Sequence, residues 1–176
     1  MNWRWLLIWI VLLAVSSCAL SSNGGTGPPL KGQVVDAETG KPLKGVVVLA
    51  YWTKYTASPG GWAGGGFSDS EEVVTGPDGR FVIRPRPTYT IPGVTKVSYD
   101  VVIFKPGYGE WRIRSDKGDE AVIALPPLKT REERLKFYDS LRWSGLIPLE
   151  RTKSLREAED VERAYLGFRK MHEGRP

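Results

Sequence analysis

Chemically reactive side chains are scarce in this sequence of 176 residues, which contains one cysteine and one histidine. A single cysteine excludes an intramolecular disulfide and any zinc site built from several cysteines. A single histidine excludes His-rich metal sites. That histidine, His172, lies four residues from the C-terminus, whereas Ser-His-Asp catalysis needs an imidazole that is held firmly in place. The composition therefore argues against an enzyme, and we predict no catalytic residue, no metal site and no cofactor.

A hydrophobic run long enough to span a bilayer is also lacking. The longest run extends from Trp5 to Val15 and follows Arg4. It is well short of the roughly 20 apolar residues of a transmembrane helix. Its length matches the apolar core of a secretory signal peptide, usually about 7–15 residues. Residues 1–17 are therefore predicted to be a signal peptide that directs export.

The only cysteine follows this run directly, in Val15-Ser16-Ser17-Cys18. An aliphatic residue, two small residues and a cysteine resemble the lipobox of bacterial lipoproteins. In that family the cysteine receives a diacylglycerol thioether, the chain is cut just before it, and the new amine is acylated. The resemblance implies that Cys18 is the lipid attachment site. Several acyl chains anchor stably, because each buried CH₂ contributes about 0.8 kcal/mol.

The residue after the cysteine, Ala19, resembles the pattern that is sorted to the outer membrane, facing the periplasm. The resemblance therefore implies an exported protein that is bound to a membrane through its lipid. The alternative is an ordinary secreted protein that is cut after Ser17 or Ala19, in which Cys18 is incidental.

Excess charge is small once the signal peptide is removed. The mature chain loses Arg4 and keeps 24 Lys and Arg against 20 Asp and Glu, a net charge of +4. Nucleic-acid binding usually shows a concentrated basic stripe, and the densest cluster here is only Arg84-Pro85-Arg86. We expect no nucleic-acid partner and a weak preference for an acidic envelope polymer or an anionic lipid surface.

The chain after the cysteine divides into a tether and a β-rich domain. Residues 18–29 are small and rich in Gly and Ser, which predicts a flexible tether. Between residues 30 and 128, short apolar runs alternate with turn signals, a pattern typical of an antiparallel β-sandwich. The fold class is therefore predicted to be mainly β, a seven-stranded sandwich. Its strands are expected at 31–36, 45–53, 72–75, 80–84, 97–103, from 111 onwards, and at 121–125.

The period of the apolar residues becomes helical after Thr130, which predicts a helical C-terminal segment over residues 129–176. Thr130 with Glu133, and Ser154 with Glu157, each form the pattern of a capping box at a helix start. Gly145 is the expected end of the first helix. The second helix has an apolar stripe that we expect to pack on the sandwich or on the first helix. The stripe consists of Leu155, Ala158, Val161, Tyr165 and Phe168.

Three segments, residues 32–46, 75–81 and 104–108, resemble the hallmarks of the carboxypeptidase regulatory-like domain. The resemblance covers about residues 30–128 and implies a transthyretin-like (prealbumin-like) β-sandwich. The whole layout is similar to that of small bacterial lipoproteins that carry this one domain. In that family the module assists an enzyme, acts as a spacer or binds a partner, and it brings no catalytic residue. The resemblance implies a non-enzymatic envelope lipoprotein that binds or assembles with an unknown envelope protein or glycan.

A long, Gly-rich loop is predicted between Ser58 and Phe67, after the central strand. Aromatic faces in such a loop can stack on sugar rings or fill a partner's pocket. The predicted ligand contacts of a carbohydrate- or peptidoglycan-binding module are Trp52, Tyr55, Trp62 and Phe67. The alternative is that these aromatics cover the sandwich edge or the helices. An accessory domain that stabilises a separate envelope enzyme is the further functional alternative.

Two remaining chemistries stay open. Asp69, Glu71 and Glu72 lie close together, but they lack the regular spacing of a calcium loop. Solvated carboxylates are the expectation there, with weak Ca²⁺ binding as the alternative. The single asparagine of the mature chain, Asn23, lies in the tether. This position argues against a Lys–Asn isopeptide cross-link and leaves a Lys–Asp version open.

Overall fold

The computed structural model describes residues 29–86, 90–109, 111–113, 121–140 and 147–168. The predicted signal peptide, Cys18, nearly all of the tether, Gly145 and His172 lie outside these ranges. The described elements, in chain order, are β1 (Leu30–Asp36), β2 (Val47–Ser58), β3 (Gly61–Val74), β4 (Arg80–Ile83), β5 (Thr95–Phe104), β6 (Trp111–Ile113), β7 (Ala121–Leu125), α2 (Arg131–Ser140), a 3-10 turn η1 (Leu149–Arg151) and α3 (Lys153–Leu166).

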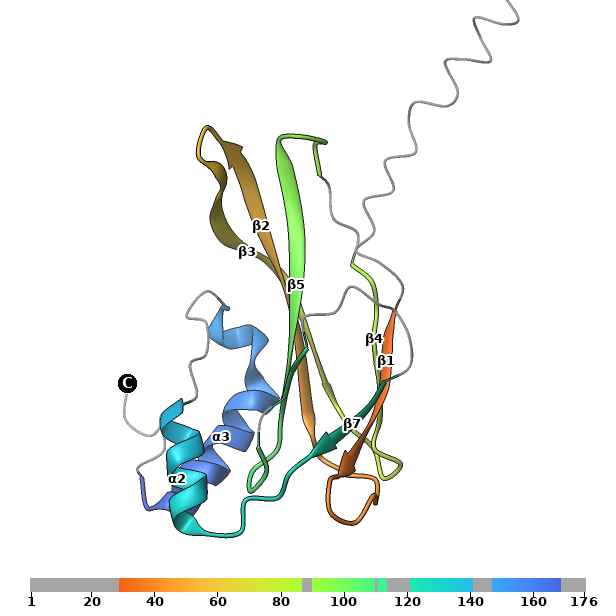
Figure 1. Ribbon diagram of the computed structural model, residues 1–176, viewed down its shortest axis with the longest axis vertical. Helices are drawn as coiled ribbons and strands as arrows, with labels where there is room; N and C mark the ends of the chain where they lie inside the picture. Colours follow the sequence, from red (N-terminus) through yellow and green to blue (C-terminus); the bar gives the residue numbers. More distant parts are fainter. Residues whose placement is uncertain (1–28, 87–89, 110, 114–120, 141–146, 169–176) are drawn as a thin grey trace, which may run out of the picture.

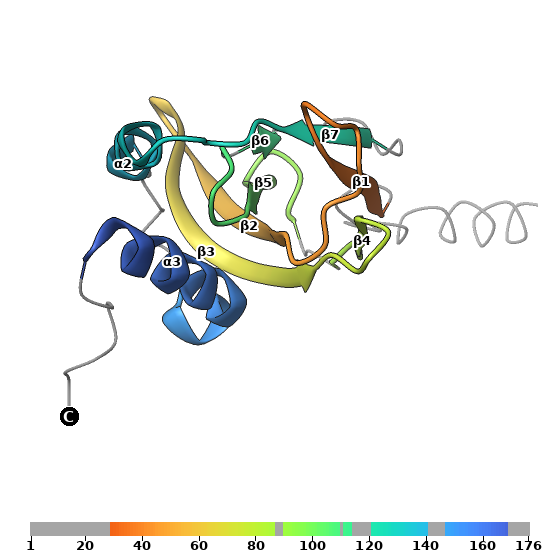
Figure 2. The ribbon, with the colours of Figure 1, turned by 90° about the horizontal axis from the view of Figure 1, so that it is seen from below.

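The described strands form two sheets that face one another. One is three-stranded with the order β4-β1-β7, and the other is four-stranded with the order β3-β2-β5-β6. Helices α2 and α3 cover the outer face of the four-stranded sheet (Figures 1 and 2). The predicted mainly β, sandwich-like arrangement is therefore confirmed, with the helices as a third layer. The expectation that the sandwich is antiparallel throughout is wrong, because β1 and β7 pair in parallel.

Strand β2 is buried on both faces over its first half. Val48 and Ala50 join the core between the sheets, together with Phe81 and Ile123. The alternate residues, such as Leu49, pack on the other face against the helices. Because successive side chains point to opposite faces, a strand between two apolar layers has a continuous apolar sequence. This explains the unbroken run from Val46 to Trp52 and confirms the expectation of a central, covered strand.

The predicted loop between Ser58 and Phe67 is wrong, because these residues form a β-hairpin. Strand β2 continues to Ser58, a short turn follows, and β3 pairs with β2 back to Val74. The glycines that suggested a loop lie at an irregularity of the strand. Gly64 and Gly65 have positive φ angles of 87° and 119°, and the pairing slips between Lys54 and Tyr55. A bulge of this kind favours glycine, since other side chains rarely adopt positive φ.

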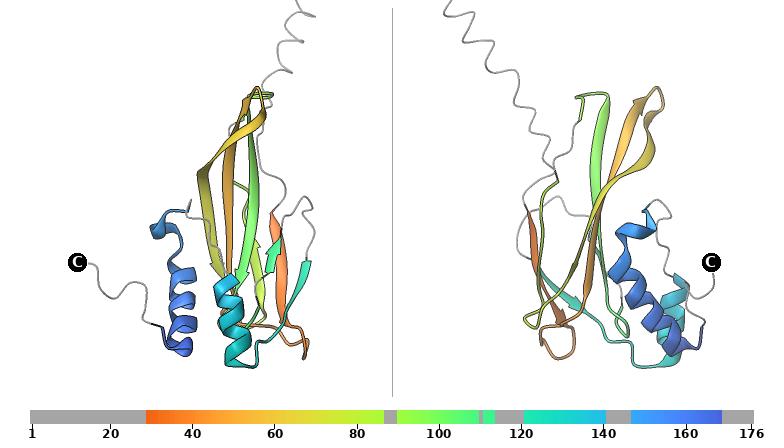
Figure 3. Two further views of the ribbon diagram at one scale, coloured as in Figure 1. Left: turned by 60° about the vertical axis from the view of Figure 1, so that its left-hand side comes forward. Right: turned by 180° about the vertical axis from the view of Figure 1, so that it is seen from behind.

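The hairpin and β5 extend well beyond the three-stranded sheet (Figure 3). Their outer ends therefore form a single layer, whereas their inner ends belong to the sandwich. We call this outer end, residues 54–67 and 90–97, the projecting tip, and the remaining sheets with the helices the base.

The start of α2 agrees with its predicted capping box. The Glu133 backbone N–H donates to Thr130 Oγ1 at 3.1 Å, and the Thr130 N–H donates to Glu133 Oε2 at 3.2 Å. The second box is wrong, because the first N–H groups of α3 find a different acceptor. Ser154 and Leu155 donate to the two carboxylate oxygens of Glu72, on β3, at 2.8 and 2.7 Å. A sheet residue thus caps the helix and fixes it to the sheet.

The buried face of α3 also differs from its predicted apolar stripe. Its buried residues are Leu155, Glu159, Glu162 and Leu166, whereas Val161, Tyr165 and Phe168 are 59%, 52% and 40% exposed. The helix is rotated relative to the prediction because Glu162 has strong partners inside. Those partners are Arg134 and the Gly107 N–H, described below.

Candidate functional site

The four predicted ligand contacts separate into two groups. Trp52 is 2% exposed and belongs to the core between the sheets. Its ring centroid lies 6.2 Å from that of Tyr99. A ligand cannot reach this buried ring. Trp52 therefore packs in the core of the sandwich, in line with the alternative that these aromatics pack on the protein itself.

The other three aromatics share the outer face of the hairpin. In the β2–β3 register Thr53 lies opposite Phe67, Tyr55 opposite Gly64, and Ala57 opposite Trp62. Opposed residues of an antiparallel pair point to the same face, and so do alternate residues of β2. Tyr55, Trp62 and Phe67 therefore lie on one surface, although the sequence does not reveal the register that unites them.

A lysine from the neighbouring strand joins this aromatic face. Lys96 lies opposite Tyr55 in the β2–β5 register. Its Nζ is 5.6 Å from the centroid of the Tyr55 ring and 5.4 Å from that of the Trp62 ring. Both distances fit cation–π attraction. The cation holds the two rings side by side and leaves Trp62 46% exposed.

More apolar surface is exposed at the end of the projecting tip. Ile91 is 62% exposed and Val94 is 46% exposed. The Ala57 backbone N–H donates to the Val94 carbonyl at 2.7 Å, which brings the turn before β5 beside the end of the hairpin. Trp62, Ile91 and Val94 thus come from different turns and gather at one end. Grouped exposure of this kind marks interaction sites more often than single exposed residues do.

The acidic residues of β3 do not gather around one point. Asp69 Oδ2 and Glu71 Oε2 lie 3.5 and 3.8 Å from the Arg86 guanidinium, whereas Glu72 caps α3. Within the described ranges, no group of three or more His, Cys, Asp or Glu side chains could hold a metal ion. Ion pairing and helix capping account for these three carboxylates without calcium.

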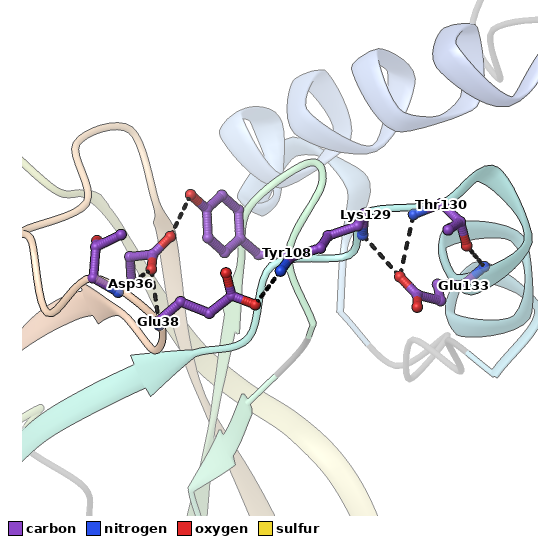
Figure 4. A network of polar contacts seen from close by, with 7 residues as sticks. Asp36, Glu38, Tyr108, Lys129, Thr130 and Glu133 are labelled. Carbon is purple, nitrogen blue, oxygen red and sulfur yellow. Dashed lines mark hydrogen bonds and ion pairs between the residues drawn. The ribbon is translucent and has the colours of Figure 1, made fainter.

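The base contains a polar network where the sandwich meets the helices (Figure 4). Asp36, at the end of β1, accepts the N–H groups of Glu38 and Thr39 at 2.9 and 2.8 Å and the Tyr108 hydroxyl at 3.0 Å. These bonds, led by that of Thr39, lower the pKa of Asp36. Burial and the nearby Asp36 carboxylate raise the pKa of Tyr108. A charged acceptor of several donors fixes the turn after β1 against the turn that carries Tyr108.

Strand β1 is tied to the turn before β4 and to the segment that follows β1. That turn joins the two sheets, so the hairpin expected there from the sequence is wrong. The Val34 N–H donates to the Gly79 carbonyl, and the Leu43 N–H donates to the Val34 carbonyl, each at 2.9 Å. A Cβ added at Gly79 would lie 2.4 Å from the Val34 carbonyl oxygen, so only glycine fits. The three segments that resemble family hallmarks thus meet at one end of the sandwich.

Charged side chains then connect the sandwich to the helical layer. Lys129 Nζ lies 2.6 Å from Glu38 Oε1 (Figure 4). Deeper inside, Arg134 of α2 pairs with Glu162 of α3, whose side chain is 1% exposed. Glu162 also accepts the Gly107 N–H at 2.8 Å. Because this carboxylate holds α2, α3 and a sandwich turn together, the helices form a fixed part of the base.

Arginine and aromatic side chains also contact one another on the helices and just after α3. Two groups, Arg134 with Tyr165 and Arg163 with Tyr138 and Phe168, are together called the helix cluster. The Arg134 guanidinium lies 3.4 Å from the centroid of the Tyr165 ring. The Arg163 guanidinium lies 5.8 Å from the Tyr138 and Phe168 ring centroids, and Arg163 also donates to the Tyr138 hydroxyl at 2.7 Å. These contacts hold the side chains in place while Tyr165 and Phe168 stay accessible. The sequence predicted these two aromatics to be buried and so gave no sign of this surface.

No family model matches the chain, and no curated protein matches it. Several solved chains are weakly similar, and two of them are described here. A 9R-lipoxygenase from Cyanothece PCC8801 has 14% identity and a TM-score of 0.32, and the match covers 68% of this chain and 20% of that chain. An alternative pilotin from the type II secretion system of Vibrio cholerae has 12% identity and a TM-score of 0.29, with 56% and 93% covered. Similarity at this level supports no conclusion about function. Among the described residues, the helices are too short or too polar to cross a bilayer.

Proposed function

We propose that this chain is an exported, lipid-anchored protein of the bacterial cell envelope that binds or assembles with a partner protein and catalyses no reaction. The anchor is Cys18, on the lipobox resemblance of residues 15–18, and the membrane is the outer one, facing the periplasm. The domain is a carboxypeptidase regulatory-like, transthyretin-like sandwich of seven strands. The meeting of residues 32–46, 75–81 and 104–108 at one end of the sandwich supports this membership.

The observation that carries the binding role is the helix cluster. Tyr and Arg are enriched among the residues that dominate protein interfaces. Here Tyr165 and Phe168 remain exposed although Arg134 and Arg163 hold them in fixed positions. Ordered side chains lose little conformational entropy when a partner covers them. A partner-binding surface gains from such ordering.

Cross-linking in intact cells, followed by purification of the tagged full chain, tests this role. We expect one abundant cross-linked envelope protein that is lost in Tyr165→Ala/Phe168→Ala. Val122→Ala is the matched control, because Val122 is 69% exposed on β7, away from the cluster. If the double variant keeps the same cross-link, the helix cluster is not the binding surface. If the captured protein is an enzyme whose activity depends on the chain, the accessory role is the correct version of the proposal.

The anchor is tested separately by Cys18→Ala. We expect this variant to leave the membrane fraction and to lose the acylated N-terminus that mass spectrometry detects in the wild-type chain. A variant that still fractionates with membranes would contradict lipid attachment at Cys18.

One observation favours carbohydrate binding as a second candidate. Tyr55, Trp62 and Phe67 lie on one face, where planar rings can stack on sugars. Binding to peptidoglycan fragments that disappears in Trp62→Ala would support it. Equal binding by the variant and the wild-type chain would exclude the tip as a glycan site.

A further inference from the structure

The projecting tip presents apolar side chains at its far end. Trp62, Ile91 and Val94 are 46%, 62% and 46% exposed. Trp62 lies at the start of β3, and Ile91 and Val94 lie in the segment before β5. The end of the β2–β3 hairpin and the start of β5 are far from the helices (Figure 1). Tryptophan and aliphatic side chains at such a position are suited to the boundary between headgroups and acyl chains, where an amphipathic ring is most stable.

The charge of the tip has one sign. The two stretches that build it, residues 54–67 and 90–97, contain no Asp, Glu, Asn or Gln. Lys96 lies on the face that carries Tyr55, opposite that residue. Lys54 is the neighbour of Tyr55 on β2 and therefore points to the other face. A lysine thus flanks the apolar end on each side, which complements an anionic surface.

The start of the domain faces the same direction as the tip. Leu30 lies opposite Ile83, and the next residue, Arg84, donates its N–H to Glu71 at 3.1 Å. From Glu71 to Trp62, β3 rises about 3.3 Å per residue, or roughly 30 Å. Strand β1 runs away from the tip (Figure 1), so its first residue is the one nearer to it.

The tether is long enough for this geometry. Residues 18–29 can span at most about 40 Å when fully extended. That length exceeds the roughly 30 Å between the level of Leu30 and the end of the tip. A lipid at Cys18 therefore allows the tip to reach the bilayer that holds the anchor.

We propose that the projecting tip docks on the anionic phospholipid surface of the membrane to which Cys18 is attached, with Trp62, Ile91 and Val94 inserted at the interface and Lys54 and Lys96 beside the headgroups. A glycan fits this tip less well. Recognition of sugar hydroxyls uses carboxylates and amides beside the stacked ring, and the tip stretches lack both. A protein partner fits less well too, because the rim of a protein interface is usually polar, and Lys54 and Lys96 are the only charged residues of the tip stretches.

This inference rests on the proposed lipid anchor, and one preparation tests the two separately. The full chain is produced in cells, purified with its N-terminus characterised by mass spectrometry, and reconstituted in vesicles of phosphatidylglycerol and phosphatidylcholine. The fluorescence of Trp62 is obtained as the difference between the wild-type chain and Trp62→Phe. We expect lipids brominated on the acyl chains to quench this fluorescence.

Each lysine near an anionic surface strengthens docking roughly fivefold. Lys54→Gln/Lys96→Gln is therefore expected to lower the ratio of docked to undocked tip about 25-fold and to remove the quenching. Lys41→Gln/Lys44→Gln is the matched control, since both lysines are exposed in the base, and it should quench like the wild-type chain. Vesicles of phosphatidylcholine alone should give the result of the tip variant.

The outcomes are distinct. A vesicle-bound, acylated chain whose Trp62 is not quenched overturns the docking proposal and leaves the anchor intact. Quenching of Trp62 in a chain without acylation supports docking and overturns the anchor. If Lys41→Gln/Lys44→Gln loses as much quenching as Lys54→Gln/Lys96→Gln, the net charge of the chain, and no specific surface of the tip, determines docking. That result would overturn the proposal.

Discussion

The base and the projecting tip share three strands, yet different interactions stabilise them. In the base, β2 lies between two apolar layers, and an ion pair and hydrogen bonds connect the sandwich to the helices. In the tip, the same strands have no second sheet, and Trp62 and Ile91 are largely exposed. The base also contains carboxylates and cations in close contact, such as Glu162 with Arg134, whereas the tip stretches contain no carboxylate. Substitutions at buried positions of the base should therefore change stability, whereas substitutions in the tip should change membrane binding and leave stability nearly unchanged.

The largest loss of stability is expected when the buried ion pair is broken. Arg134→Leu leaves the carboxylate of Glu162 without its cation in a site where that side chain is 1% exposed. Removing one partner of a buried pair commonly costs about 3–5 kcal/mol, and we expect a loss of about that size in urea unfolding. The double variant Arg134→Leu/Glu162→Leu should recover part of it, because no buried charge is then left unpaired. A single variant as stable as the wild-type chain would show that the pair does not hold the helices.

A second test of the base uses pH. Burial, and then Asp160, raise the pKa of Glu159 from 4.5 to about 7, and its Oε1 has no hydrogen-bond partner. The folded state therefore holds this proton more strongly than the unfolded state. Stability should fall as pH rises from about 4.5 to about 7 and stay reduced above that.

Glu159→Gln removes this titration. One pKa unit corresponds to about 1.4 kcal/mol, so the variant should gain at most about 3 kcal/mol over the wild-type chain between pH 4.5 and pH 8. Urea unfolding of both chains across this range measures the difference. A difference that does not change with pH would show that Glu159 titrates normally in the folded protein.

The cap of α3 allows a smaller, paired test. Glu72→Ala removes the acceptor of the Ser154 and Leu155 N–H groups and should lower the free energy of unfolding by about 1–2 kcal/mol. Ser154→Ala removes the hydroxyl that the sequence pattern pointed to and should change it by less than about 0.5 kcal/mol. Chemical denaturation of both variants gives the comparison. If Ser154→Ala lowered the free energy of unfolding more than Glu72→Ala, the capping box of Ser154 and Glu157 would be supported instead.

The smallest effects on stability are expected in the tip. Ile91→Ser and Lys54→Gln alter exposed side chains and should each change the free energy of unfolding by less than about 0.5 kcal/mol. The same denaturation experiment measures them. A loss of more than about 2 kcal/mol from either would mean that the tip is packed as firmly as the base.

The sequence predicted features that depend on residues close together in the chain, and it did not predict features that depend on residues far apart in the chain. The box of Thr130 and Glu133 depends on residues within one turn, and it was predicted correctly. The cap of α3 comes from Glu72, which is more than eighty residues away in the chain, and no local pattern reveals it. The predicted apolar stripe of α3 was right for Leu155 and Ala158, which pack on the sheet. It was wrong for the later positions, for a similar reason. Glu162 is buried because Arg134 of α2 pairs with it inside the protein. The hydrophobic periodicity of α3 considers only the residues of that helix and so cannot predict this ion pair.

The candidate site likewise has parts that the sequence predicted and parts that it did not. Aromatic residues after the central strand indicated an interaction surface, and Tyr55 and Trp62 do lie together. Gly64 and Gly65 suggested a mobile loop, but here they form a bulge in a strand. The contribution of Ile91 and Val94 depends on the bond between Ala57 and Val94, a contact between two turns that the sequence alone does not place side by side.

Hydrogen exchange of the full chain, measured in anionic vesicles and in detergent, tests directly whether the tip contacts the membrane and the base does not. We expect the vesicles to slow exchange in peptides from residues 61–67 and 91–96, while peptides from β1 and β7 exchange equally in both. Slower exchange in the base with an unchanged tip would contradict the division of the molecule into a stabilising base and a membrane-contacting tip.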